Sequence, residues 1–214
     1  MTNATTAKRE RARAVRLSES KRGRQILDAA GRLFAEKGYE ATSMEDIADA
    51  VGVLKGGLYY YIDTKETLLF QIILEAHDSL VDRFEVYAQV KGNALDKLHA
   101  FIEGHMRMNV TNLFLGANFY LNNSALSTEH REIIMERRRR FDNFLRRLML
   151  DGKAEGTVRQ EVDEKLAAIG ILTSLNSAYL WFRPERGNVD YVAQQFADLF
   201  VQGLAVSGAR DVAR

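Results

Sequence analysis

The residues best suited to chemistry lie between Thr42 and Lys65, where a lysine and a run of tyrosines follow a glycine turn. The Lys55 ammonium can donate to a phosphate oxygen or to the edge of a base. The phenol of an outward-pointing tyrosine, here Tyr60, suits a phosphate oxygen. These residue types at this spacing predict a surface that binds nucleic acid.

Two short helices joined by a turn are predicted to position these side chains. The first begins at Thr42 or Ser43, because either hydroxyl can accept a hydrogen bond from the free N–H groups of a helix start. Gly52 ends this helix, since glycine tolerates the left-handed conformation that a sharp reversal needs. The apolar stripe of the helix comprises Met44, Ile47, Ala48 and Val51.

The second helix, of about two turns, is expected to begin near Leu54 or Lys55. Leu58 and Ile62 share one face of it, so Tyr60, rotated by roughly 200° from Leu58, points outward. Two helices joined by a short glycine turn form a helix-turn-helix, whose second helix can enter the DNA major groove. An all-helical protein without DNA binding is the alternative that this pattern leaves open.

Four motifs follow one another between residues 24 and 70: AA-x-x-LF-x-x-x-GY, TS-x-x-DIA-x-x-x-GV, G-x-LY-x-Y and TKE-x-LL. In this order they resemble the DNA-binding domain of TetR-family transcriptional repressors. The resemblance implies that Lys65 matches a lysine that often contacts the DNA backbone. The residues predicted to bind DNA are Thr42, Ser43, Lys55, Gly56, Gly57, Tyr59, Tyr60 and Lys65.

Two positions depart from the family pattern. Leu54 stands where the family often has serine or a similar cap, and Gly57 stands where it usually has threonine or serine. The first departure weakens the helix start, and the second removes a hydroxyl that could contact DNA. Base recognition is therefore expected to depend more on Lys55 and Tyr59.

The composition is that of a globular protein with uneven charge. Of 214 residues, 46% are hydrophobic and 28% charged, none is cysteine, and the net charge is +1. Residues 1–24 carry eight basic and two acidic side chains, whereas residues 25–70 carry a net charge of −4. We expect residues 1–20 to form a basic flexible arm, which is either a solvated tail or a contact to phosphates or a minor groove.

The same composition bears on location and on chemistry. The lack of cysteine, of a long apolar run and of a hydrophobic signal core predicts a cytoplasmic protein that does not span a membrane. Four histidines without metal-ligand spacing, and no P-loop, GxGxxG or GxSxG motif, predict no catalytic residues, no metal and no cofactor. We expect no enzyme; a helical enzyme or interaction module is the alternative from a different class.

The rest of the chain is predicted to be helical, without strands. The fold class is all-α: an N-terminal three-helix helix-turn-helix domain (21–66) and a C-terminal helical domain for ligand binding and dimerisation (67–214). A long helix from Asp63 or Thr64 is expected to link the two. Further helices are predicted at 94–110, 114–121, 127–153, 163–182 and 189–206. One face of the helix at 94–110 carries a stripe of Leu95, Leu98, Ile102, Met106 and Asn109. The helix at 163–182 is apolar nearly all round, so we expect it to be buried on two sides.

A small-molecule site is predicted inside the C-terminal domain. Apolar side chains with a few polar groups can line a cavity between helices, although they can equally form plain core. Arg138 falls within an apolar stripe of its helix, so its charge needs an internal carboxylate or an anionic ligand. The candidates are Met106, Met108, Phe114, Phe119, Tyr120, Arg138, Asn176 and Tyr179.

The last two helices carry more apolar surface than one helical layer covers, which predicts a homodimer that would suit a near-palindromic operator on double-stranded DNA. The segment YLWFRP (residues 179–184) with the following amphipathic helix resembles some TetR-family regulators of fatty-acid and steroid catabolism that respond to acyl-CoA thioesters. The resemblance implies a repressor released by a small molecule, for which an acyl-CoA is the first candidate. A regulator of efflux that responds to a hydrophobic drug is the alternative.

Overall fold

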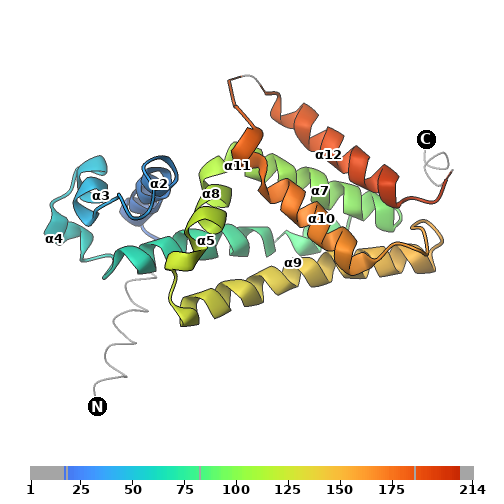
Figure 1. Cartoon of the computed structure of the whole chain (residues 1–214), viewed down its shortest axis with the longest axis horizontal. Helices are drawn as coiled ribbons and strands as arrows, with labels where there is room; N and C mark the ends of the chain where they lie inside the picture. The colour runs from blue at the N-terminus through green and yellow to red at the C-terminus, as the bar shows by residue number, and fades with distance from the viewer. Residues whose placement is uncertain (1–16, 18, 82, 186, 208–214) are drawn as a thin grey trace, which may run out of the picture. The chain divides into compact units, whose positions relative to one another are not determined.

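The structure is a computed structural model that describes residue 17 and residues 19–81, 83–185 and 187–207 (Figure 1). In these residues the regular elements are helices, and the one bridge joins Val158 to Ala205. The predicted all-α fold is confirmed. The helices are α2 (Lys21–Glu36), α3 (Met44–Ala50), α4 (Lys55–Leu58), α5 (Lys65–Val81), α6 (Phe84–Ala88), α7 (Ala94–Thr111), α8 (Leu113–Asn122), η1 (Asn123–Ala125), α9 (Thr128–Ala154), α10 (Glu164–Asn176), α11 (Ala178–Trp181) and α12 (Val189–Leu204).

The chain forms two compact units. The first extends to Ala76 and includes Ala117–Glu132; the second comprises His77–Gly116 and the chain from Ile133 onward. The first unit therefore contains most of α5, the end of α8 and the start of α9 in addition to the helix-turn-helix. The boundary at residues 66 and 67 stays a prediction.

The first unit is built on α2, which presents Ile26, Ala30 and Phe34 to a core shared with Ile47 of α3 and Leu58 of α4. The Ser20 side chain caps α2 by accepting a hydrogen bond from the Gly23 N–H at 2.9 Å. Ahead of this cap, Leu17 is fully buried, and a Cβ at Gly23 would lie 2.0 Å from its carbonyl oxygen. Glycine is thus required where the chain enters the unit. The rest of the predicted arm, residues 1–16 and 18, lies outside the described residues.

The predicted turn after α3 is present, but the second helix is shorter than expected. Gly52 adopts φ 67°, as a left-handed turn requires. The regular part of α4 has only 4 residues, and it continues as turns through the hydrogen bond from Ile62 N to Leu58 O (3.2 Å). Two consecutive glycines and the lack of a capping side chain at Leu54 explain the short helix, because both lower helix stability.

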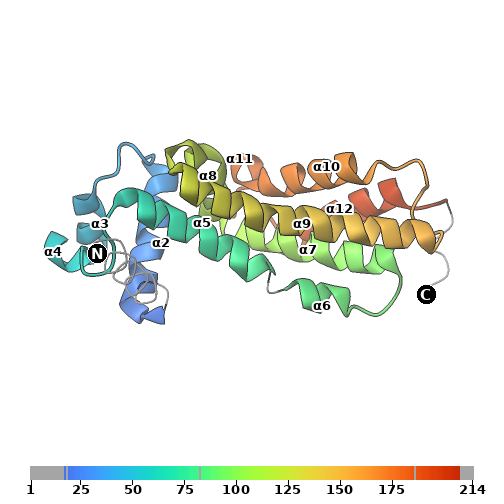
Figure 2. The same cartoon turned by 90° about the horizontal axis from the view of Figure 1, so that it is seen from below.

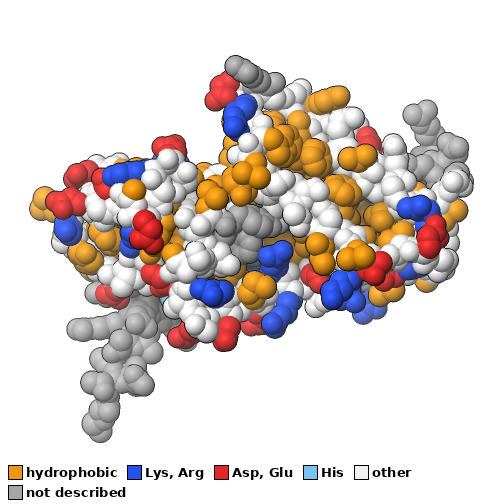
Figure 3. Space-filling view, viewed as in Figure 1, with side chains coloured by type: hydrophobic (Ala, Val, Ile, Leu, Met, Phe, Trp, Pro, Cys, Tyr) orange, Lys and Arg blue, Asp and Glu red, His pale blue; other side chains and the backbone are white. Residues whose placement is uncertain are grey.

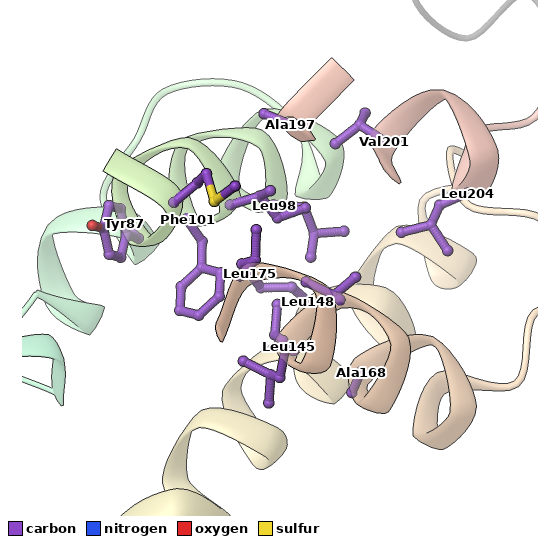
Figure 4. Close-up of a cluster of buried hydrophobic side chains, with 14 of the residues drawn as sticks. Tyr87, Leu98, Phe101, Leu145, Leu148, Ala168, Leu175, Ala197, Val201 and Leu204 are labelled. Atoms are coloured by element: carbon purple, nitrogen blue, oxygen red, sulfur yellow. The ribbon is translucent and has the colours of Figure 1, made fainter. Parts of the chain in front are cut away.

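The second unit is centred on α7. Helices α6, α10, α11 and α12 all pack on α7, and Figure 2 shows α6 beside it. Figure 4 shows the core, where Leu98 of α7, Leu145 and Leu148 of α9, and Leu175 of α10 lie together. The predicted buried stripe of α7 is confirmed for Leu95, Leu98, Ile102, Met106 and Asn109.

The single helix predicted over 163–182 is wrong. The helix breaks at Ser177 into α10 and α11, and the Ser177 hydroxyl donates to the carbonyl of Ser174 at 2.8 Å. Serine side chains that bond to the backbone in this way favour helix ends. The expectation that this helix is buried on two sides is also wrong for the single chain, since Leu166 is 65% exposed.

Candidate nucleic-acid interface and effector site

Ser43 begins α3 through a reciprocal pair of hydrogen bonds. Its hydroxyl accepts from the Asp46 N–H at 3.1 Å, and the Asp46 carboxylate accepts from the Ser43 N–H at 2.7 Å. Lys37 donates to the same carboxylate at 2.9 Å. The hydrogen bond from Lys37, followed by those from Ser43, holds the pKa of Asp46 well below its usual range. The predicted cap at Thr42 or Ser43 is therefore made by Ser43.

Thr42 has an internal position. Its side chain is buried, its hydroxyl donates to the carbonyl of Gly38 at 2.8 Å, and its N–H donates to Tyr39 O at 3.2 Å. A DNA contact through this hydroxyl would require the hydrogen bond to open. The structure thus shows a role for Thr42 in closing the connection between α2 and α3.

Lys65, at the start of α5, binds the backbone of the connection between α2 and α3. Its ammonium donates to Tyr39 O at 2.7 Å, to Thr42 O at 3.0 Å and to Glu40 O at 3.4 Å, and it lies 4.2 Å from the centre of the Tyr39 ring. An ammonium has three donors, so these carbonyls occupy all of them. Burial raises the pKa of Tyr39 to about 12, so the phenol beneath Lys65 stays neutral. The predicted DNA contact of Lys65 is untested, but the structure shows this internal role.

The turns of α4 present the remaining predicted contacts at the surface. Leu58 and Ile62 are buried while Tyr60 is 56% exposed, which confirms the predicted orientation. The Lys55 ammonium lies 3.5 Å from Glu45 Oε2 in an exposed ion pair. Exposed pairs of this kind contribute little, so Lys55 can exchange Glu45 for a phosphate or base at small cost. Tyr59 is also exposed.

Gly56 and Gly57 are not required by the fold. A Cβ at Gly56 would meet no atom within 4 Å, and one at Gly57 would lie 3.8 Å from the Val53 Cβ, an ordinary contact. Neither glycine has a positive φ. The bare backbone instead leaves space on α4 for the close approach of another molecule.

The predicted effector residues are distributed over both units. Met106 is buried in α7, Asn176 ends α10, Tyr179 lies in α11, and Arg138 is half-buried in α9, where it has an interaction partner. The second unit also contains Met108 and Phe114. Phe119 and Tyr120 lie on α8 in the first unit, and their side chains are outside the described part.

Two polar residues that the sequence analysis did not include among the effector candidates lie beside Asn176. The Asn176 Oδ1 is 3.0 Å from His105 Nε2 and 3.1 Å from Asn109 Nδ2. Burial lowers the pKa of His105 to about 4, so its ring is neutral near pH 7. His105 and Asn109 stand four residues apart on the apolar stripe of α7, and that spacing was the available signal. The described residues contain no group of three potential metal ligands.

An apolar surface extends over α10, α11 and α12 (Figure 3). Leu199 is 66% exposed, and the Trp181 ring stacks on Phe196 at 5.4 Å. No helix in the described ranges is long and apolar enough to cross a membrane. The other exposed members of this surface are Leu166, Ile169, Leu180 and Tyr191.

Known proteins match both parts of the chain. The family model for "Bacterial regulatory proteins, tetR family" matches residues 26–72, and that for "Tetracyclin repressor-like, C-terminal domain" matches residues 91–204. The HTH-type transcriptional repressor KstR2 of Rhodococcus jostii is 30% identical over 203 residues, covering 87% of this chain and 93% of KstR2. The fatty acid metabolism regulator protein of Bacillus subtilis is 28% identical over 184 residues, with 84% and 94% covered.

One similar protein has been solved with both a ligand and DNA bound. AibR, in complex with isovaleryl coenzyme A and operator DNA, superposes with a TM-score of 0.74 at 29% identity, covering 86% of this chain and 98% of AibR. The bound isovaleryl coenzyme A and the operator DNA belong to the AibR structure.

Replacing Lys65 by methionine should destabilise the protein, because Tyr39 O and Thr42 O lose a charged donor. We expect the free energy of unfolding to fall by about 1–3 kcal/mol in urea denaturation. The control Lys55→Met removes an exposed lysine and should change it by less than about 0.5 kcal/mol. Equal effects of the two variants would contradict the internal role of Lys65.

Replacing Gly56 by alanine should separate stability from DNA binding. Alanine fits the protein and favours the helix, so the free energy of unfolding should stay unchanged or rise by up to about 1 kcal/mol. The new methyl group would obstruct close approach, so affinity for operator DNA should fall by at least about tenfold in fluorescence anisotropy. Unchanged affinity would show that DNA does not approach this backbone.

Proposed function

Because the chain belongs to the tetR family of bacterial regulatory proteins, we propose that it is a transcriptional repressor that binds a near-palindromic operator on double-stranded DNA and is released by an acyl-CoA thioester. One observation carries the DNA-binding half of the proposal. Helix α4 and the turns that continue it present Lys55, Tyr59 and Tyr60 at the surface beside two glycines that the fold does not need. Exposed cationic and phenolic donors next to bare backbone suit a DNA major groove.

The effector half of the proposal rests on the relatives and on the second unit. AibR binds isovaleryl coenzyme A, and a relative from Bacillus subtilis regulates fatty-acid metabolism. In this chain a polar cluster around Asn176 lies within an apolar core, which suits an acyl group. Helix α9 carries eight basic and five acidic side chains, including Arg138, and its net charge of +3 suits the phosphates of coenzyme A.

Three helices connect an effector site in the second unit to the first unit. Helices α5, α8 and α9 each have residues in both units. Within the first unit, Asn118 of α8 donates to the carbonyl of Gly31 in α2 at 2.8 Å. A shift of α8 would therefore act on α2.

A second connection joins α9 to α5. The Glu66 carboxylate accepts from the Ser127 N–H at 2.9 Å and lies 2.8 Å from His130 Nδ1. The His130 ring stacks on Phe70 at 3.8 Å. Because Glu66 follows Lys65, a shift at the start of α9 would reach the residue that holds the connection between α2 and α3.

The protein is proposed to act in the cytoplasm as a homodimer. The exposed apolar surface over α10, α11 and α12 is the surface that a second copy would cover, and a two-fold dimer presents two copies of α4 to a palindromic site. Monomers seldom expose an apolar patch of this kind without a partner.

The test is binding of the purified protein to DNA from upstream of its own gene, titrated at fixed salt with straight-chain and branched acyl-CoAs. We expect tight binding that one class of thioester abolishes, while free coenzyme A leaves it unchanged. Tight binding that only hydrophobic drugs release would support a regulator of efflux. Equal affinity for this DNA, a panel of genomic fragments and random DNA would contradict the repressor.

Two variants of the exposed residues on α4 and the turns that continue it should affect DNA binding in different ways. Tyr60→Phe removes a phosphate donor, so it should weaken binding to operator and to random DNA by the same factor. Lys55→Ala removes a donor that can reach a base edge, so it should also lower the ratio of the two affinities. Equal loss on both DNAs from Lys55→Ala would rule out base recognition by this residue.

A charge placed on the apolar surface should separate the dimer. Leu199→Glu would bury a carboxylate in the proposed interface, so the protein should sediment as a monomer and lose high-affinity operator binding. The matched control is Val86→Glu. Val86 is 63% exposed, and it lies on α6, which is not part of the proposed interface. A dimeric Leu199→Glu variant would place the interface elsewhere.

A further inference from the structure

His105 is buried in the second unit with one ring nitrogen unpaired. Its side chain lies on α7, is 2% exposed and packs near Phe101 and Phe141, whose ring centres are 5.5 and 5.9 Å away. Nε2 contacts Asn176, whereas Nδ1 is buried without a hydrogen-bond partner among the residues that the structure describes. A buried polar atom without a partner is costly, so this nitrogen calls for an explanation.

The neighbouring hydrogen bonds determine which ring nitrogen carries the proton. The carbonyl of Leu175 can only accept, so the Asn109 group 3.0 Å from it must be the amide Nδ2, which donates. The same Nδ2 also donates to Asn176 Oδ1, which is therefore an acceptor towards His105 as well. His105 Nε2 must then be the donor.

The remaining nitrogen, Nδ1, is consequently an acceptor. Burial keeps the ring neutral, with a pKa of about 4, so Nδ1 carries a lone pair and no proton near pH 7. Its partner must be a hydrogen-bond donor. The aromatic rings around His105 favour a molecule that is otherwise apolar.

The polar cluster does not need His105 for its own stability. Asn176 Oδ1 still accepts from Asn109 at 3.1 Å when the histidine is absent. An aliphatic residue at position 105 would complete the core without an unpaired acceptor. The stability of the cluster therefore does not explain the histidine at position 105.

We propose that His105 Nδ1 anchors the acyl part of the effector by accepting a hydrogen bond, so that the effector is a thioester whose acyl chain carries a hydroxyl group. This inference rests on the proposed thioester effector. Asn176, already a predicted ligand residue, and the adjacent Met106 place the anchor within the predicted effector site. At Gly116 in α8, a Cβ would lie 3.4 Å from the Asn176 carbonyl oxygen, so α8 packs close to Asn176.

The test compares matched thioesters in the operator-release assay: hexanoyl-CoA, 3-hydroxyhexanoyl-CoA and 6-hydroxyhexanoyl-CoA. A site built to bond a hydroxyl discriminates against the analogue that lacks it. The wild-type protein should be released by one hydroxylated thioester at a concentration at least about tenfold lower than by hexanoyl-CoA. In His105→Leu this preference should disappear while hexanoyl-CoA still acts.

Two further variants control for structural effects. His105→Gln retains an acceptor and should keep part of the preference. His99→Leu changes a histidine on the same helix whose nitrogens lie 3.1 Å from Asp198 and 3.7 Å from Glu103, and it should keep the whole preference. Equal release of the wild type by all three thioesters, or a preference that survives in His105→Leu, would overturn the anchor while leaving the thioester effector intact.

A failure of the thioester effector is recognised separately. If no thioester releases the DNA, the proposed effector class is wrong, and the anchor is tested by the thermal shift of the protein with octanoic acid and with 3- and 8-hydroxyoctanoic acid. A larger stabilisation by one hydroxy acid that is lost in His105→Leu would support the anchor for another class of ligand. No difference between the acids would overturn it.

Discussion

The position of α3 and α4 depends on one partly buried electrostatic contact, in which the Lys65 ammonium donates to three backbone carbonyls between α2 and α3. Those carbonyls lie in a connection that no regular helix satisfies, so Lys65 supplies the donors that the backbone lacks. Thr42 closes the same connection from within through its hydroxyl. Because Lys65 belongs to α5, the position of α3 and hence of α4 is fixed by the helix that continues into the second unit.

Electrostatics makes this arrangement sensitive to small shifts. Residues 25–70 carry a net charge of −4, so attraction to DNA must come from a few placed cations and from the basic residues 1–24. Such contacts hold only when two copies of α4 match the spacing of the operator grooves. An effector therefore does not have to unfold α4; a change in the distance between the two copies of α4 suffices. The contacts of Glu66 with Ser127 and of Asn118 with Gly31 can transmit such a change.

The sequence predicted the regular features of the fold, which follow from periodicity and local chemistry. The stripe of α7, the cap at Ser43 and the glycine turn at Gly52 are local rules and were confirmed. Features set by distant partners could not be predicted in this way. The contacts of Lys65 with the carbonyls of Tyr39 and Thr42, and the contact of His105 with Asn176, join residues far apart in the chain. The break at Ser177 reflects a local hydroxyl competing with a strong apolar pattern.

In the proposed mechanism, a thioester changes the separation of the two copies of α4 in the dimer. The chain contains no cysteine, and Asp28, exposed on α2 and outside the predicted DNA contacts, accepts a spin label as Asp28→Cys. Pulsed electron–electron double resonance on the operator-bound dimer should give one narrow distance distribution, because the operator holds the two helix-turn-helix motifs at the spacing of its half-sites. Adding the releasing thioester should shift or broaden that distribution. An identical distribution with and without bound thioester would contradict the account.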